Sequence, residues 1–280
     1  MAGWCAIVLA LREPEQDRLS SRLPTYLHPL AGRSLAWHVM RTLSELDPAP
    51  EPLLLVGSPM LDAAVTGEVP AVVVHTRDGV PWCDPVWEQL RPGCERVLLV
   101  DAAAPALEAS LEVFMAGPAG RVLRAPGGEA LALLMDVEEA RERCALGATL
   151  EAVGEGLETA AAERPEEGFV VRDRAGLARA AALVRRRTVE GLMEGGVTFL
   201  APESVIVDVD VQIGADTIIY PGVVLEGRTT IGGETVIGPG CRIIDAQVGS
   251  GVELKGYNYI VRTRIRNRAV LEPYVRRGFD

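Results

Sequence analysis

An aliphatic residue recurs at every sixth position along the last part of the chain, from Val207 onward. The interval shortens to five residues twice, before Val248 and before Ile265. Neither the 3.6-residue period of a helix nor the alternation of a strand produces a six-residue repeat. A parallel β-helix of triangular section does, because each of its three sides takes one hexad per coil. The series runs through Val207, Ile213, Ile219, Leu225, Ile231, Ile237, Ile243, Val248, Leu254, Ile260, Ile265 and Leu271.

A second position of the hexads is restricted in size. Four residues after most members of the series stands a small or short-branched residue, such as Thr217, Thr235 or Cys241. We expect these residues to fit where the chain turns a corner of the triangle. Glycines that directly follow the aliphatic residue, such as Gly214 and Gly232, supply permissive backbone for those turns.

The first part of the chain has a different pattern, in which short apolar runs alternate with stretches of helical periodicity. The runs lie at 6–10, 53–56, 71–74 and 97–101. Runs of this length are typical of buried parallel strands, and their alternation with helices predicts an α/β layer fold. We therefore expect an α/β domain over 1–195, which ends in a bridging helix at about 174–194, and a β-helix of about four coils over 196–280.

Composition narrows the class of protein. No apolar run approaches the roughly 20 residues that a bilayer requires, and the N-terminus lacks the pattern of a signal peptide. The five cysteines are scattered and form no C-x-x-C pair, which disfavours a disulfide framework or a zinc site. The net charge of −11 disfavours nucleic acid as a partner. We expect a cytoplasmic protein with neither a membrane nor a nucleic-acid partner.

Charge and histidine are unevenly distributed. From Leu200 onward ten acids face nine bases, so about −10 of the net charge of −11 belongs to the first 199 residues. Lys255 is the single lysine, and none of the histidines lies in the repeat region. Cationic chemistry in this chain therefore depends on arginine.

Three motifs carry a resemblance to a known family. They are the stretch LPTYLHPLAGR at 23–33, the segment VRDR at 171–174, and the run from Arg185 through Thr198 that leads into the repeats. Together they resemble the bifunctional N-acetylglucosamine-1-phosphate uridyltransferase/glucosamine-1-phosphate acetyltransferase family. The resemblance implies a Rossmann-like α/β nucleotidyltransferase domain followed by a left-handed parallel β-helix of hexapeptide repeats. It also implies a homotrimer assembled through the β-helix.

The phosphate-binding part of that family is altered here. Its glycine-rich loop after the first strand is replaced by LREPEQDR at 11–18, which has no glycine and three acids. Arg12 and Arg18 are the only residues of this segment that favour an anion. The lysine that the family places in its L-P-K motif, where it would neutralise transition-state charge, is Thr25.

The family's two magnesium-binding positions are altered as well. Ala103 and Arg172 stand where the family has aspartate and asparagine, and neither supplies the oxygen ligand that a hard cation prefers. Asp101 lies two residues before the first position. We expect the Arg172 guanidinium to replace the metal charge and to pair with Asp101 or Asp173, because a buried guanidinium is costly unless it is paired.

We expect the family's acetyltransferase site to be absent, because no histidine is present in the repeats to act as a base. A group of arginines near the end of the chain allows two interpretations, a solvated edge or an anion- or partner-binding rim of the trimer. The group comprises Arg262, Arg264, Arg266, Arg268, Arg276 and Arg277.

These observations favour a catalytically impaired relative of UDP-N-acetylglucosamine pyrophosphorylase that acts as a trimeric sugar-nucleotide-binding, regulatory or scaffold protein. It would have no catalytic residue, metal or cofactor, and its candidate anion or nucleotide contacts are Arg12, Arg18, Asp101 and Arg172. Two alternatives stay open. One is an active sugar-1-phosphate nucleotidyltransferase that uses a rearranged site with magnesium, and the other is an assembly module without a ligand.

Overall fold

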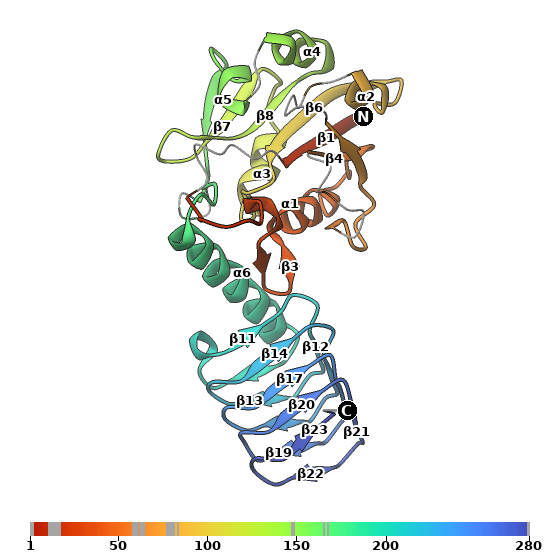
Figure 1. Cartoon of the computed structure of the whole chain (residues 1–280), viewed down its shortest axis with the longest axis vertical. Coiled ribbons are helices and arrows are strands. Elements are labelled where there is room, and N and C mark those ends of the chain that lie inside the picture. Colours follow the sequence, from red (N-terminus) through yellow and green to blue (C-terminus); the bar gives the residue numbers. More distant parts are fainter. Residues whose placement is uncertain are drawn as a thin grey trace. The chain divides into compact units, whose positions relative to one another are not determined.

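A computed structural model of the chain describes residues 3–10, 18–57, 61, 65–76, 82, 84–146, 149–164, 166 and 168–278 (Figure 1). It divides into two compact units. Unit 1 comprises Met1–Pro29 and Ser34–Ala180, and unit 2 comprises Leu30–Arg33 and Ala181–Asp280. Within the described residues, no helix combines the length and the apolar character needed to span a membrane.

Unit 1 is built on a mixed sheet of seven strands in the order β5-β4-β1-β6-β8-β7-β9. The first four strands in this order are mutually parallel, and β8 runs antiparallel to both β6 and β7. The four predicted apolar runs lie in these parallel strands, so the expected α/β layer is confirmed. The strands are β1 (Gly3–Ala10), β4 (Leu53–Gly57), β5 (Val72–His75), β6 (Cys94–Asp101), β7 (Arg121–Arg124), β8 (Ala130–Asp136) and β9 (Glu158–Ala161).

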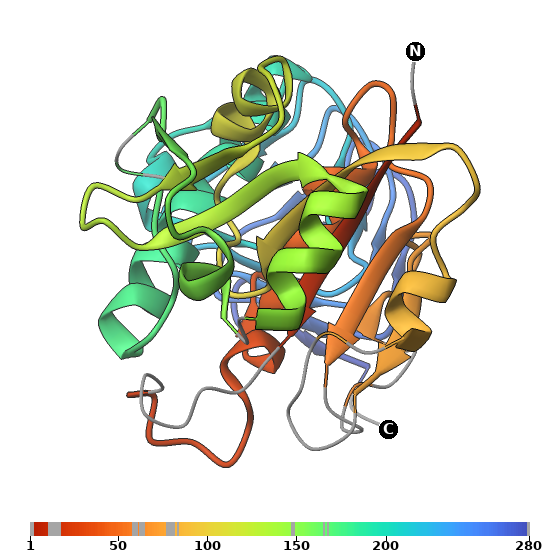
Figure 2. The same cartoon turned by 90° about the horizontal axis from the view of Figure 1, so that it is seen from above.

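Helices cover the sheet of unit 1. Every residue of β1 from Trp4 to Ala10 is buried, as expected for a central strand with both faces covered. Helix α1 packs on β1 and β4, whereas α4 packs on β6 and β8, and Figure 2 shows α4 lying across the sheet. The Ser34 hydroxyl caps α1 by accepting a hydrogen bond from the Trp37 amide. The helical segments are η1 (Thr25–Leu27), α1 (Leu35–Ser44), α2 (Asp84–Glu88), α3 (Glu108–Met115), α4 (Val137–Leu146) and α5 (Leu150–Val153).

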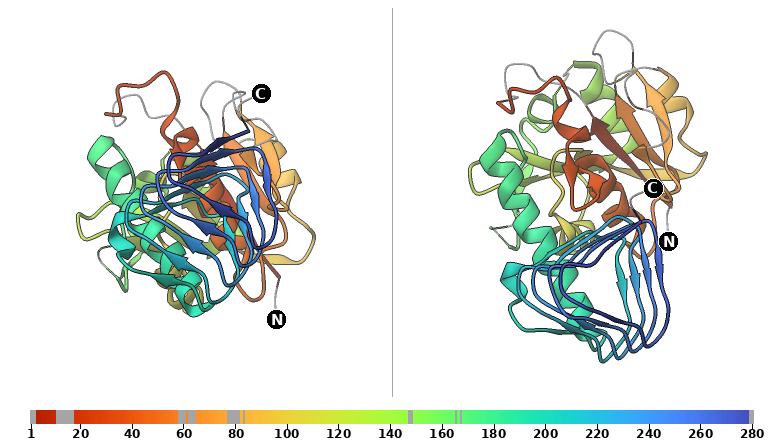
Figure 3. Two further views of the ribbon diagram at one scale, coloured as in Figure 1. Left: turned by 90° about the horizontal axis from the view of Figure 1, so that it is seen from below. Right: turned by 60° about the horizontal axis from the view of Figure 1, so that its bottom comes forward.

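Helix α6 (Arg174–Glu194) contains the division between the two units, and residues 198–277 of unit 2 form a left-handed parallel β-helix (Figure 3). The first face consists of β10 (Thr198–Phe199), β13 (Ile218–Ile219), β16 (Val236–Ile237), β19 (Glu253–Leu254) and β22 (Val270–Leu271). The second consists of β11 (Ile206–Val207), β14 (Val224–Glu226), β17 (Arg242–Ile244), β20 (Tyr259–Val261) and β23 (Arg276–Arg277). The third consists of β12 (Gln212–Ile213), β15 (Thr230–Ile231), β18 (Gln247–Val248) and β21 (Arg264–Ile265).

The hexad series forms the interior of these coils, as predicted. Leu225, Ile243 and Ile260 are in register on successive coils of the second face, and each is fully buried. The short-branched position has a polar role as well. The buried Thr217 hydroxyl donates to the Gly232 carbonyl oxygen at 3.1 Å, and Thr235 donates likewise to Gly249. A threonine at this corner therefore fills space and satisfies a backbone acceptor of the next coil.

One corner of the β-helix changes composition along its length. Gly222 and Gly240 have φ of 71° and 63°, and the equivalent positions of the next coils are Tyr257 and Tyr274, at 54° and 66°. The left-handed region costs a side chain about 1–2 kcal/mol. The two tyrosine rings stack in parallel with centroids 5.3 Å apart, and this contact offsets part of that cost.

The segment Leu30–Arg33 packs on the first coil of the β-helix, although it belongs to the stretch that resembles the uridyltransferase motif. Ala31 accepts a hydrogen bond from the Val209 amide at 3.1 Å. Arg33 forms an ion pair with Asp210, with Nε and Oδ2 2.6 Å apart. Unit 2 is therefore assembled from two stretches that lie far apart in the sequence.

Asp208, beside this segment, lies in surroundings that disfavour the charged form of its carboxyl group. Burial raises the pKa of its carboxyl above the ordinary 3.8, and the nearby carboxylates of Glu226, Asp210 and Asp245 raise it further. A hydrogen bond from the Gly227 amide, 2.8 Å from Oδ2, acts in the opposite direction. The folded state thus holds the Asp208 proton more tightly than the unfolded chain does, so stability falls as the pH rises from 3.8 through the raised pKa.

Asp208→Asn should therefore raise the melting temperature at pH 7, because it removes the buried charge and keeps an oxygen that can accept from Gly227. The gain should shrink as the pH falls toward 3.8, where Asp208 becomes protonated. Thermal unfolding of both proteins over a pH series measures this. Asp210→Asn is the control, and should lower the melting temperature because it weakens the ion pair with Arg33. A lower melting temperature for Asp208→Asn at pH 7 would contradict the prediction.

Candidate functional site

The parallel strands of unit 1 end together at one edge of the sheet. β1 ends at Ala10 and lies between β4 and β6, and Leu9 is in register with Asp101. From β1 the chain continues to β4 on one side and later returns to β6 on the other. The carboxyl ends of β1 and β6 therefore mark the point where the strand order reverses, which is where open α/β sheets bind ligands. We call Arg18, Asp101–Ala103 and Arg172 the strand-end site.

Three segments meet at the strand-end site through backbone hydrogen bonds. The Val171 amide donates to the Ala103 carbonyl oxygen at 2.8 Å, and the Arg18 amide donates to the Arg172 carbonyl oxygen at the same distance. The structure thus brings together Arg18, Asp101 and Arg172, three of the residues chosen from the sequence. Arg12, the fourth, lies outside the described residues. The two positions aligned with the family's magnesium ligands, Ala103 and Arg172, are neighbours here.

The carboxylate of Asp101 takes part in the turn that follows β6. Its Oδ1 accepts a hydrogen bond from the Ala103 amide at 2.8 Å, and its carbonyl oxygen accepts one from the Ala104 amide at 3.1 Å. This is the local geometry by which aspartate stabilises a turn. Asp101 therefore stabilises the turn at the edge of the sheet where a ligand would approach.

The predicted partners of Arg172 are wrong. Arg172 pairs with Glu129, with Nε and Oε1 3.2 Å apart and side chains 29% and 43% exposed. Asp173 is engaged elsewhere, since its Oδ1 accepts from the Gly176 amide in the first turn of α6 at 2.7 Å. Asp101 is held by its own turn. Glu129 lies in the hairpin between β7 and β8, 43 residues from Arg172, and no local sequence signal connects the two.

The residues of the strand-end site do not fit a magnesium ion. Ala103 offers no side-chain ligand, and Arg172 places a cation at the second position. Asp101 and Asp173 each use a carboxylate oxygen in a backbone hydrogen bond. Over the described part of the chain, no group of three or more His, Cys, Asp or Glu residues could hold a metal ion.

The six arginines near the end of the chain lie on two faces and two corners of the β-helix. Arg262 and Arg268 occupy corners with φ of 43° and 58°. Arg264 belongs to β21 of the third face, and Arg266 directly follows that strand. Arg276 and Arg277 form β23 of the second face. Arg276 lies 5.7 Å from the Tyr259 ring centroid, a cation–π distance.

Comparisons with known proteins agree with both units. The family model described as "Bacterial transferase hexapeptide (six repeats)" matches residues 210–245. The chain is 38% identical over 129 residues to "Bifunctional protein GlmU" of Carboxydothermus hydrogenoformans, a match that covers 45% of this chain and 29% of that protein. It is 40% identical over 122 residues to the protein of the same name from Alkaliphilus oremlandii, covering 44% and 27%. The chain thus spans less than a third of the length of these relatives.

A solved structure supports the fold of the first part. "Crystal structure of 4-diphosphocytidyl-2C-methyl-D-erythritol synthase" matches with a TM-score of 0.50 at 15% identity, over 66% of this chain and 99% of that one. At this identity the match shows the fold alone. The resemblance predicted from the motifs is confirmed over the matched stretches: the chain is similar to the bifunctional GlmU proteins, with a nucleotidyltransferase-type α/β fold and a hexapeptide-repeat β-helix.

Proposed function

We propose that this protein is a GlmU-related, catalytically impaired sugar-nucleotide-binding protein, which acts as a trimeric regulator or scaffold. The observation that carries the proposal is the pairing of Arg172 with Glu129 at the strand-end site. This ion pair occupies a position where a magnesium-dependent transferase of this fold requires an oxygen ligand. A fixed guanidinium attracts phosphate groups, but it neither coordinates nor activates them as a metal does.

The loss of turnover follows from the number of altered groups. Phosphoryl transfer depends almost entirely on positioning and on charge stabilisation. Thr25 stands at the lysine position, and the two metal-ligand positions hold Ala103 and Arg172. Removing a single stabilising donor can slow an enzyme by about 10²–10³-fold. Several such losses compound, although their effects are not additive.

Pyrophosphate release from UTP and N-acetylglucosamine 1-phosphate should therefore stay at background with magnesium present. We expect a rate at least about a thousandfold below that of a GlmU protein assayed in parallel, measured with a coupled pyrophosphate assay. Magnesium-dependent turnover at ordinary enzyme rates would refute the proposal and favour the active nucleotidyltransferase instead.

Binding should persist without turnover, because backbone hydrogen bonds place two cationic residues, Arg18 and Arg172, next to the turn that follows β6. Isothermal titration with UDP-N-acetylglucosamine should give saturable binding. Arg172→Gln should weaken it about tenfold, the effect expected for one charge-assisted hydrogen bond. Arg91→Gln is a matched control, since Arg91 is 67% exposed and pairs with Glu51 on the surface of the same unit. No binding by the unaltered protein would favour the assembly module.

The trimer is proposed from the outward rows of the β-helix. Apolar and aromatic residues point outward on two of its faces, and the outward row of the third face is polar throughout. Adjoining exposed apolar faces mark an interface, and closed cyclic symmetry buries such patches in identical subunits. The interface residues are Ile218, Tyr220 and Val236 of the first face and Val224 of the second.

A further inference from the structure

The third face of the β-helix differs from the other two in its outward row. Register places Gln212, Thr230, Gln247 and Arg264 one above the other, and none of them is apolar or acidic. The residue that follows each strand is a glycine in the first three coils and Arg266 in the last. In the last coil of this face an arginine thus replaces a neutral polar residue in the outward row, and a second arginine replaces the glycine that follows the strand.

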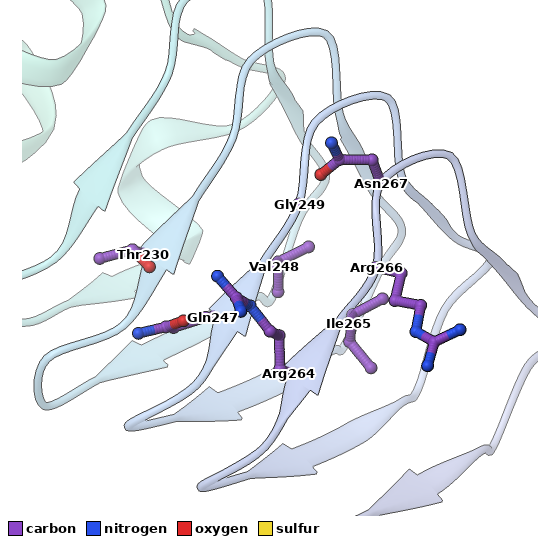
Figure 4. Close-up of a pocket in the computed structure, with 8 residues that line it drawn as sticks. All are labelled: Thr230, Gln247, Val248, Gly249, Arg264, Ile265, Arg266 and Asn267. Atoms are coloured by element: carbon purple, nitrogen blue, oxygen red, sulfur yellow. The ribbon is translucent and has the colours of Figure 1, made fainter.

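A groove of about 740 Å³ lies at this end of the third face (Figure 4). The described residues of its lining include two arginines and three neutral polar side chains, and none of them carries a carboxylate. In Figure 4 the Arg264 side chain extends back toward Gln247, whereas Arg266 extends away from both. Both arginines belong to the lining, and their guanidinium groups extend in different directions. Its lining residues are Thr230, Gln247, Val248, Gly249, Arg264, Ile265, Arg266 and Asn267.

Among the described residues, the two guanidinium groups of the groove have no acidic partner. Over the described part of the chain, no ion pair engages Arg264 or Arg266, unlike Arg242, which pairs with Glu226. The side-chain oxygen Oδ1 of Asn267 accepts a hydrogen bond from the Ser250 backbone amide at 3.1 Å. The side-chain nitrogen of Asn267 can therefore act as a donor. The groove is thus lined by side-chain donors with few competing acceptors, an arrangement that suits an anion rather than a cation.

The charge of the repeat region changes sign along the chain. From Leu200 to Cys241 there are six acids and one base, a formal charge of −5. From Arg242 to Asp280 there are four acids and eight bases, a formal charge of +4. The groove lies in the positive half, so its field attracts an anion before contact is made.

We propose that this groove binds a diphosphate-bearing small molecule. Guanidinium groups match phosphate oxygens in a bidentate geometry, and two of them in the lining of one groove offer a contact to each of two linked phosphates. The groove consists only of unit 2 residues, so it is distinct from the strand-end site of unit 1. It lies on the face that the proposed trimer leaves uncovered, and the inference goes beyond the proposed function.

Isothermal titration of the full chain with inorganic pyrophosphate tests the inference. The variant Arg264→Gln with Arg266→Gln should bind at least tenfold more weakly than the unaltered protein, because the charge-assisted hydrogen bonds of both lining arginines are lost. Arg268→Gln is the matched control, since Arg268 lies in the same coil but outside the lining, and it should stay within about twofold. Circular dichroism and sedimentation should show that all variants fold and assemble alike.

Three further titrations separate the possible outcomes. Orthophosphate should bind more weakly than pyrophosphate, and UDP should bind at least as well if a nucleotide is the natural source of the diphosphate. Citrate should bind more weakly than pyrophosphate, and an equal affinity would overturn the assignment to phosphate. Absence of pyrophosphate binding, or an equal loss in Arg268→Gln, would overturn the groove itself. Arg172→Gln should leave the pyrophosphate binding that depends on Arg264 unchanged. A loss of pyrophosphate binding in the groove can therefore be distinguished from a loss of sugar-nucleotide binding at the strand-end site.

Discussion

Ile243→Ala is expected to lower the free energy of unfolding of the β-helix by about 2–5 kcal/mol. Ile243 is fully buried and lies in register between Leu225 and Ile260, so the truncation leaves a cavity inside a column of aliphatic side chains. The coils above and below are fixed by backbone hydrogen bonds and cannot collapse into the gap. Urea unfolding, followed by circular dichroism, measures the change.

Two controls show whether the cavity is the cause. Ile243→Val removes one methylene and should cost about 0.5–1.5 kcal/mol. Val113→Ala alters a side chain that is 57% exposed and should change stability by less than about 0.5 kcal/mol. If Ile243→Ala costs no more than Val113→Ala, the aliphatic column does not stabilise the β-helix and the explanation of the hexad repeat fails.

Ile218→Arg combined with Val236→Arg is expected to convert the proposed trimer into a monomer. The two residues are in register on neighbouring strands of the first face, so the double variant places adjacent like charges in a surface that three subunits would have to desolvate. Sedimentation at micromolar concentration should give about three times 30.0 kDa for the unaltered chain and about 30.0 kDa for the variant.

The third face supplies the matched control. Thr230→Arg combined with Gln247→Arg places the same two charges on neighbouring strands in register, on the face proposed to remain in solvent. That variant should keep the trimeric mass. A monomeric mass for the unaltered chain would refute the trimer, and loss of assembly in both variants would show that the choice of faces is wrong.

The sequence predicts those parts of the fold that depend on short-range repetition. The hexad interval assigns Leu225 and Ile243 to the interior, because one coil always takes about three hexads. The buried runs of unit 1 are recognised for the same reason, since each carries its own signal over five or so residues. Even the strand-end position of Asp101 follows from where an apolar run stops.

Contacts between distant segments could not be predicted in this way. The Arg172–Glu129 pair depends on how the β7–β8 hairpin meets the segment before α6, whereas the sequence pointed to Asp101 or Asp173 as the partner. For the proposed anion-binding groove, the sequence does contain a signal that pairs two of its lining residues. Gln247 and Arg264 are 17 residues apart, one coil with a single shortened step, so the spacing already places them side by side.

The packing of Leu30–Arg33 on the first coil bears on the order of events during synthesis. The Arg33–Asp210 contact spans 177 residues, so the ribosome must make most of the chain before it can close. Later coils need only their immediate neighbours and can add one after another. Closing so long a loop slows assembly more than it weakens the finished protein, because the entropic cost grows only with the logarithm of loop length. In a nascent chain, Leu30–Arg33 therefore stays without its final packing partner until the first coil has been synthesised.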